Sequence, residues 1–93
     1  MPDGALANPR RITCTTRKGR RLVEVGGNEG EAWRMSVERA IRAIESGEQV
    51  LYCTIGDQSY LVMVGLDGSG AKFLKTMIDE DEPSCLLQLP DCP

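Results

Sequence analysis

The sequence predicts a small α+β domain with the element order ββαβββ, in which a mostly antiparallel sheet carries one helix on a face. Five short runs rich in β-branched residues are separated by turn residues, and one run has helical periodicity. A chain of 93 residues, 41% hydrophobic and 27% charged, has the length and composition of one globular domain. We therefore expect a flexible lead-in over 1–10 and a single domain over 11–93.

The first two runs predict a β-hairpin. Residues 11–16 alternate apolar and threonine side chains, a pattern typical of a strand. The stretch 17–20 supplies a turn with a glycine, and 22–25 returns as the second strand. Three glycines within 26–30 then predict a loop, because glycine loses the most backbone entropy when it is fixed inside an element.

One helix follows this loop. Ser36 is a favourable N-cap, and Gly47 is a favourable residue to end the helix. Glu38 and Arg42 stand in the favourable order four residues apart on the polar side. The apolar stripe consists of Val37, Ala40, Ile41 and Ile44. The pattern predicts a helix of about three turns with one buried face.

Three more strands are predicted after the helix, at 50–55, 60–66 and 71–76. The first two are apolar on both faces, as in central strands, whereas the third alternates as expected nearer an edge. An Asp-Gly pair predicts the hairpin turn between the last two. The acidic stretch 79–82 is expected outside the core, and the leucines beyond it predict that the chain end packs back onto the domain.

The four cysteines are Cys14, Cys53, Cys85 and Cys92. Free thiols are the favoured interpretation, because the sequence has no signal-peptide pattern and cytosolic thiols stay reduced. A Cys85–Cys92 or Cys14–Cys92 disulfide is an alternative. A zinc site is a further one, although the chain has no histidine and no C-x-x-C pair. We expect a cytoplasmic protein without cofactor or metal and, since no apolar run can span a bilayer, without a membrane partner.

Basic residues are concentrated in the predicted first hairpin. Six of the eleven cations lie within 10–21, where there is no acid. The candidate contact residues among them are Arg17, Lys18, Arg20 and Arg21. This cluster is expected to be solvated or attracted to the acidic chain end; nucleic acid and an acidic protein are the alternative partners. The net charge of −3 and the presence of only four aromatic residues do not favour nucleic acid.

Trp33 stands between the glycine-rich stretch and the helix. We expect it to cover the core, and the alternative is an exposed anchor for a partner or a ring-shaped ligand. Together with Arg34 and Lys75 it forms a second candidate site, which would contact a nucleotide-like anion.

Several motifs together resemble a known family. They are Ile12-Thr13-Cys14, Gly26-Gly27, Trp33-Arg34, the helix end at 40–47, Lys72-Phe73-Leu74-Lys75-Thr76 with Asp79, and Leu86-Leu87-Gln88-Leu89-Pro90-Asp91-Cys92. In this order they are similar to the small bacterial and phage proteins of the family called domain of unknown function 3892. Where that family has asparagines ahead of the double leucine, this chain has Ser84 and Cys85. The resemblance implies a compact α+β domain and no established activity.

The sequence does not predict an enzyme. A chain without histidine has no Ser/His or Cys/His pair, and Asp91 opposes thiolate formation at Cys92. We expect a small non-catalytic binding or interaction domain that acts through the basic hairpin or a groove beside Trp33. The alternatives are a binder of small or nucleotide-like anions of accessory or phage type, and a weak nucleic-acid binder that uses the basic hairpin. An open sheet edge would also permit self-association.

Overall fold

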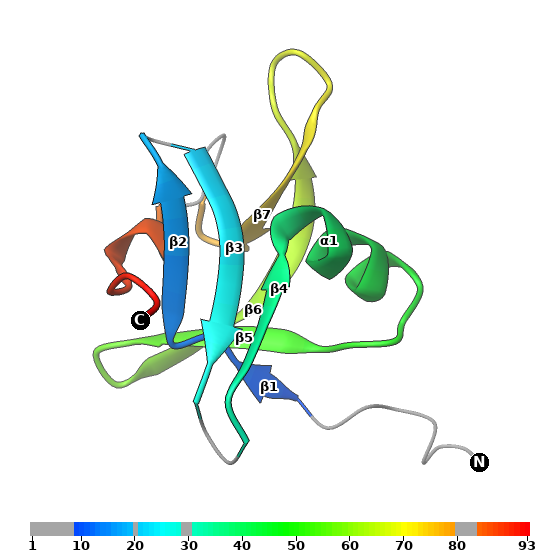
Figure 1. The fold of residues 1–93 in the computed structure, drawn as a ribbon. Coiled ribbons are helices and arrows are strands. Elements are labelled where there is room, and N and C mark those ends of the chain that lie inside the picture. The colour runs from blue at the N-terminus through cyan, green and yellow to red at the C-terminus, as the bar shows by residue number, and fades with distance from the viewer. Residues whose placement is uncertain (1–8, 20, 29–30, 80–83) are drawn as a thin grey trace, which may run out of the picture.

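The computed structural model describes residues 9–19, 21–28, 31–79 and 84–93 (Figure 1). Within them the predicted α+β class is confirmed. The elements, in chain order, are β1 (Arg10–Arg11), β2 (Cys14–Lys18), β3 (Arg21–Gly27), β4 (Trp33–Ser36), α1 (Val37–Glu45), β5 (Leu51–Ile55), β6 (Gln58–Leu66), β7 (Lys72–Thr76) and the 3-10 helix η2 (Leu86–Gln88). Most of the expected lead-in lies outside the described residues, and Arg10 already belongs to β1.

The strands form two sheets, one in front of the other, with α1 beside them (Figure 1). One sheet has the order β2-β3-β4 and is antiparallel. The other has the order β1-β5-β6-β7 and is antiparallel except for the parallel pair of β1 and β5. The mostly antiparallel arrangement and the mutual pairing of the last three strands are confirmed, but the single expected sheet is divided into two.

The division occurs inside the run that the sequence predicts as one strand. Ile12 is fully buried, and its N–H donates to the carbonyl of Tyr52 in the larger sheet, at 2.8 Å. The next N–H, of Thr13, donates to the carbonyl of Gly26 in the smaller sheet, also at 2.8 Å. Consecutive residues thus bond to different sheets, which alternation of side chains alone does not reveal.

Gly26 and Gly27 lie inside β3, so the predicted loop at this glycine pair is wrong. The physical reason is close approach of other atoms. A Cβ on Gly26 would lie 2.8 Å from the Trp33 carbonyl oxygen and 3.1 Å from the Cys14 sulfur, and Gly27 faces the Trp33 indole in the same way. The missing side chains let β4 pair with β3, and Trp33 consequently stands in a strand rather than in a loop.

The predicted helix is confirmed. The Ser36 side chain accepts a hydrogen bond from the Arg39 N–H at 3.1 Å, and Gly47 follows the last turn with φ of +79°. The helix packs its apolar face into a core that also receives the chain end through η2. The buried core residues are Ile12, Val25, Ala40, Ile41, Leu51, Cys53, Val62, Leu74, Cys85 and Leu86. Packing of the chain end onto the domain is therefore confirmed.

Asp79 is buried, with 6% of its surface exposed, and here the expected solvent-facing acidic stretch is wrong. Its carboxylate accepts hydrogen bonds from the Thr76 N–H at 2.9 Å, the Thr76 hydroxyl at 3.2 Å and the Cys85 N–H at 3.3 Å. These donors compensate the lost hydration of the carboxylate and fasten the end of β7 to the start of η2. The rest of the stretch, 80–82, lies outside the described residues. In the described part, no helix is long and apolar enough to cross a membrane.

Candidate functional site

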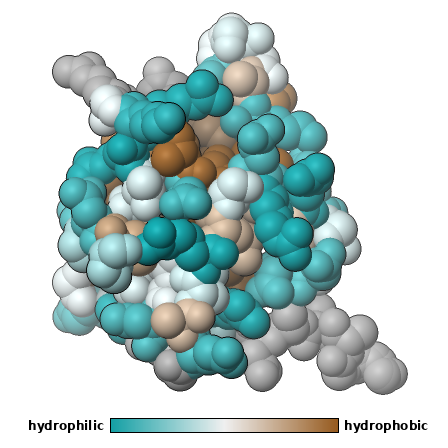
Figure 2. Space-filling view, in the orientation of Figure 1, coloured by the Kyte–Doolittle hydropathy of each residue, from teal (hydrophilic) through white to brown (hydrophobic). Residues whose placement is uncertain are grey.

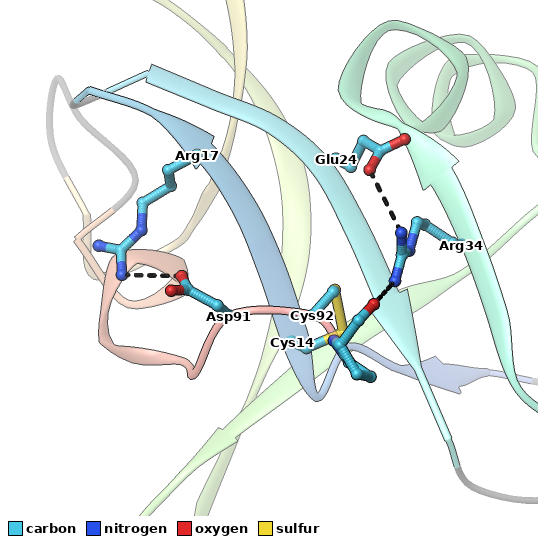
Figure 3. Close-up of a disulfide and its surroundings, with 7 residues drawn as sticks. Cys14, Arg17, Glu24, Arg34, Asp91 and Cys92 are labelled. Carbon is cyan, nitrogen blue, oxygen red and sulfur yellow. Dashed lines mark hydrogen bonds and ion pairs between the residues drawn. A yellow bond between two sulfur atoms is a disulfide. The ribbon is translucent and has the colours of Figure 1, made fainter.

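A disulfide between Cys14 and Cys92 joins β2 to the chain end (Figure 3). The expectation of free thiols is wrong for these two residues, and one of the alternative pairings is the observed one. Cys53 and Cys85 are free and buried. The described residues contain no group of three or more potential metal ligands.

Backbone pairing explains why these two sulfurs meet. The chain end runs beside β2, where the Thr15 N–H donates to the Pro90 carbonyl at 3.0 Å. The Cys92 N–H donates back to the Thr15 carbonyl at 2.9 Å. The sequence shows neither bond, since they connect segments at opposite ends of the chain.

Two of the predicted contact residues hold this chain end in place (Figure 3). Arg17 forms an ion pair with Asp91 at 3.5 Å and donates to a carbonyl of η2 at 3.2 Å. Arg34 donates to the carbonyl of Pro93 and lies 3.9 Å from a carboxylate oxygen of Glu24. The expected attraction between the basic hairpin and the chain end is therefore present at Arg17.

The other two described cations of the hairpin face solvent. Lys18 and Arg21 are partners in the β2–β3 ladder, next to the turn, and both are exposed. Neither forms an ion pair with another described residue. Arg20, between them, lies outside the described residues. In the hairpin, Arg17 thus contacts the chain end, whereas Lys18 and Arg21 form an exposed, positively charged rim.

This rim borders a groove of about 830 Å³ between the β2–β3 hairpin, α1 and the beginning of β7. Figure 2 shows apolar surface within a hollow framed by hydrophilic side chains. The apolar lining includes Leu22 and Val23 from β3 and Val37 and Ile41 from α1. A surface of this kind requires an explanation, since it keeps apolar groups partly in contact with water.

A β-bulge places two apolar side chains in the groove. Thr16 pairs with Glu24 and Arg17 pairs with Leu22, so Val23 is the extra residue of β3. A bulge changes the regular alternation of faces. As a result, the consecutive residues Leu22 and Val23 both line the groove. The sequence predicts the strand but not this irregularity.

Three charged side chains stand on the far side of the groove, namely Glu38, Asp67 and Lys72, and of these Glu38 is exposed without an ion pair to another described residue. Lys72 forms an ion pair with Glu45 at 2.9 Å. Asp67 accepts hydrogen bonds from the Ser69 hydroxyl and from the N–H groups of Ala71 and Ser69. These bonds, the one from the Ser69 hydroxyl most of all, lower the pKa of Asp67. The carboxylate is therefore occupied within the β6–β7 turn. The hairpin side, with Lys18 and Arg21, remains the positively charged border.

The second predicted set, Trp33, Arg34 and Lys75, is not brought together. Trp33 and Arg34 are neighbours in β4 and point to opposite faces. Lys75 is on β7 in the other sheet, where its aliphatic chain packs over Gly65. Trp33 is half-buried and packs against the core, and the guanidinium of Arg10 lies 5.7 Å from the centroid of its ring.

Sequence reasoning missed residues at both surfaces beside these elements. Val37 and Ile41 were assigned only to the core, although they also line the groove. Arg10 and Arg11 belong to the predicted basic cluster, but the sequence does not place them beside Trp33, where they line a hollow.

Neither free thiol has the properties of a nucleophile. Burial, with smaller effects from the nearby Cys85 and Asp79, raises the pKa of Cys53 to about 11. Burial also raises the pKa of Cys85. Both thiols therefore remain protonated at neutral pH, and their place in the core gives them a packing role.

Two sheets, one helix and a chain end bonded back to β2 define a small α+β domain with an apolar groove bordered by cations. The chain belongs to the family described as "Protein of unknown function (DUF3892)", whose model matches residues 11–90. The resemblance seen in the sequence is thereby confirmed. Its description assigns no function. No curated protein and no solved structure matches the chain.

Proposed function

We propose that this domain is a non-catalytic protein-binding module whose groove takes up an apolar, acidic segment of a partner protein. The observation that carries the proposal is the combination of an apolar lining with the Lys18–Arg21 rim. The shape supports it, because about 830 Å³ lies within the usual size range of binding clefts.

The apolar lining supplies the affinity in this proposal. Leu22 and Val23 come from a strand and Val37 from the first turn of a helix, so rigid elements hold them. Burying the exposed part of such side chains is favourable by about 25 cal/mol per Å² of apolar surface. Aliphatic side chains of a partner segment are the groups that would bury this surface.

The rim supplies the specificity. Lys18 and Arg21 are exposed neighbours of the same sign, and an acidic segment neutralises both. Charges at the edge of an interface mainly steer association and exclude partners of the same charge. Binding of nucleic acid by the whole basic hairpin has less support, since Arg17 is engaged by the chain end.

The absence of catalysis is part of the proposal. It is supported by a sequence without histidine and by two free thiols whose pKa values lie above their ordinary range. The buried carboxylate of Asp79 supports it too, because three hydrogen-bond donors from the protein already occupy it.

A designed peptide of about twelve residues, with alternating leucine and aspartate, tests the groove. We expect it to shift the NMR signals of Leu22, Val23 and Ile41. At the same peptide concentrations, the signal of Arg39, on the exposed side of α1, should stay unchanged. Two companion peptides, with serine in place of leucine or lysine in place of aspartate, are expected to bind at least about tenfold more weakly.

The matched variants separate the rim from general charge effects. Lys18→Glu with Arg21→Glu is expected to weaken peptide binding by at least about tenfold. Arg10→Glu with Arg39→Glu makes the same change of charge at exposed positions that do not line the groove and is expected to alter it by no more than about twofold. Equal losses in both double variants, or equal binding of all three peptides, would contradict the proposal.

The proposal also includes the cytosolic location expected from the sequence. Cytosolic thiols are held reduced, so Cys14 and Cys92 should be available for alkylation in acid-quenched cells. In the oxidised, purified protein, Cys14 and Cys92 should be alkylated only after reduction, whereas the free thiols Cys53 and Cys85 need no reduction. A population that is fully disulfide-bonded inside the cell would contradict a cytosolic location without affecting the groove.

A further inference from the structure

A second surface lies around β1, away from the groove residues discussed above. The short segment from Pro9 to Arg11 runs between two hollows. The first, of about 390 Å³, is lined by Pro9, Arg10, Arg11, Glu31, Ala32 and Trp33. The second, of about 420 Å³, is lined by Pro9, Val50, Tyr52, Ser59, Tyr60 and Leu61. Pro9 belongs to both, so the hollows are neighbours.

This surface collects most of the aromatic residues of the chain. The sequence has one tryptophan, two tyrosines and one phenylalanine, and Trp33, Tyr52 and Tyr60 all line these hollows. Each of the three is half-buried, and Leu61 beside them is 56% exposed. Rings held by strands and partly open to solvent are the groups on which nucleic-acid bases stack.

Cations stand next to these rings. The Arg10 guanidinium lies 5.7 Å from the centroid of the Trp33 ring, and Arg11 lines the same hollow. Arg11 is also the ladder partner of Tyr52 in β5, so its position is fixed relative to the second hollow. The guanidinium lies over the ring face, so a base that stacks on Trp33 would displace it and leave it to pair with the phosphate of the same nucleotide.

The charge of this surface argues against a second copy of the chain as its occupant. Glu31 is the one acidic residue that lines either hollow in the described structure, against two arginines. A symmetric dimer through the same patch would bring the arginines of both copies together. A polyanion instead meets complementary charge.

We propose that the surface around β1 binds single-stranded nucleic acid. One base stacks at Tyr52, and a neighbouring base stacks on the Trp33 ring in place of the Arg10 guanidinium, which then contacts the phosphate between the two bases. A single strand is required, because the two hollows receive separate, unpaired bases. The site shares no residue with the groove, so its failure and that of the proposed peptide binding are separate results.

Tryptophan fluorescence tests the inference directly, since Trp33 is the single tryptophan of the chain. Oligonucleotides of about eight thymidines or uridines are the probes. We expect them to quench the emission of Trp33 and to bind less tightly as salt rises. For the one phosphate at Arg10 on a single strand, log K should fall with a slope of about −0.7 against log salt concentration.

Variants assign the effect to β1. Arg10→Gln should reduce the affinity at least about threefold. The matched variant Arg39→Gln removes the same charge from α1 and should change the affinity by much less than Arg10→Gln does. Tyr52→Leu should weaken binding while the fluorescence of the free protein stays the same. Thermal unfolding of each variant checks that it is folded.

Three results would overturn the inference. The first is no quenching by either oligonucleotide. The second is an equal loss of affinity in Arg10→Gln and in Arg39→Gln. The third is equal affinity for a duplex or for a thymidine mononucleotide. Either result would show that the two hollows do not bind two unpaired bases.

Discussion

The sulfur of Cys92 lies over Gly26, 3.3 Å from the position that a Cβ on this glycine would occupy. The disulfide of the chain end therefore rests on a strand position without a side chain. This contact explains a glycine inside β3, where glycine is otherwise unfavourable.

Gly26→Ala should destabilise the domain by about 1–3 kcal/mol, because the added Cβ also meets the Trp33 carbonyl oxygen at 2.8 Å. Gly68→Ala is the matched control, since no atom lies within 4 Å of a Cβ at that position. Urea unfolding of both variants measures the difference. Equal urea midpoints for the two variants would show that the close contacts at Gly26 do not limit the size of the side chain there.

Removal of the disulfide should lower the free energy of unfolding by about 2–4 kcal/mol. The bond closes a loop with a sequence separation of 78, which restricts the unfolded chain strongly. Cys92→Ser and Cys14→Ser should lose the same amount, and the double variant no more than either. A reductant should reproduce the loss in the wild type and have no effect on the variants. Unfolding that is insensitive to reductant would contradict this prediction.

Asp79→Asn should destabilise the domain by about 2–3 kcal/mol, because hydrogen bonds to a buried charged acceptor are among the stronger ones. The asparagine amide group also places a donor where Thr76 and Cys85 donate. Asp57→Asn, at an exposed turn, is the control and should change stability by less than about 0.5 kcal/mol. If the free energy of unfolding falls no more than in the control, Asp79 does not stabilise the docking of the chain end.

Stability should fall between about pH 9 and pH 11 through Cys53. The pKa of this thiol is raised from 9.0 to about 11 in the folded protein, so the unfolded chain releases its proton first as pH rises. The stabilising effect is complete below pH 9, and its loss amounts to about 3 kcal/mol at about 1.4 kcal/mol per pKa unit. Comparison with Cys53→Ala by urea unfolding isolates this contribution. Parallel pH profiles for the two proteins would contradict it.

Local sequence patterns predicted the elements whose cause is local. The helix follows from its apolar stripe, Ser36 and Gly47, and the last three strands follow from composition and turns. Periodicity did not predict β1 or the second sheet, because the pairing of β1 with β5 joins distant residues. It did not predict β4 because the glycine pair that β4 approaches in β3 is typical of a loop. Gly26 has no side chain where the Cys92 sulfur approaches, and this contact also joins distant parts of the sequence.

The candidate site was predicted in part for the same reason. Charge clustering pointed to Lys18 and Arg21, which do border the groove, and also to Arg17, which holds the chain end together with Arg34 from the second predicted set. Nothing in the pattern of single residues distinguishes these two pairs. The distinction depends on where the last residues run, which only the tertiary structure shows.

The pairing of Thr15 with Asp91 has a consequence for the order of events during folding. Hairpins such as β6–β7 join neighbouring residues and can form early, whereas this contact must wait until nearly the whole chain is available. During synthesis, the outer edge of β2 thus stays open until the last segment arrives. An intermediate that has both sheets but an undocked chain end would expose that edge, and at this stage the domain is most vulnerable to pairing with a foreign strand.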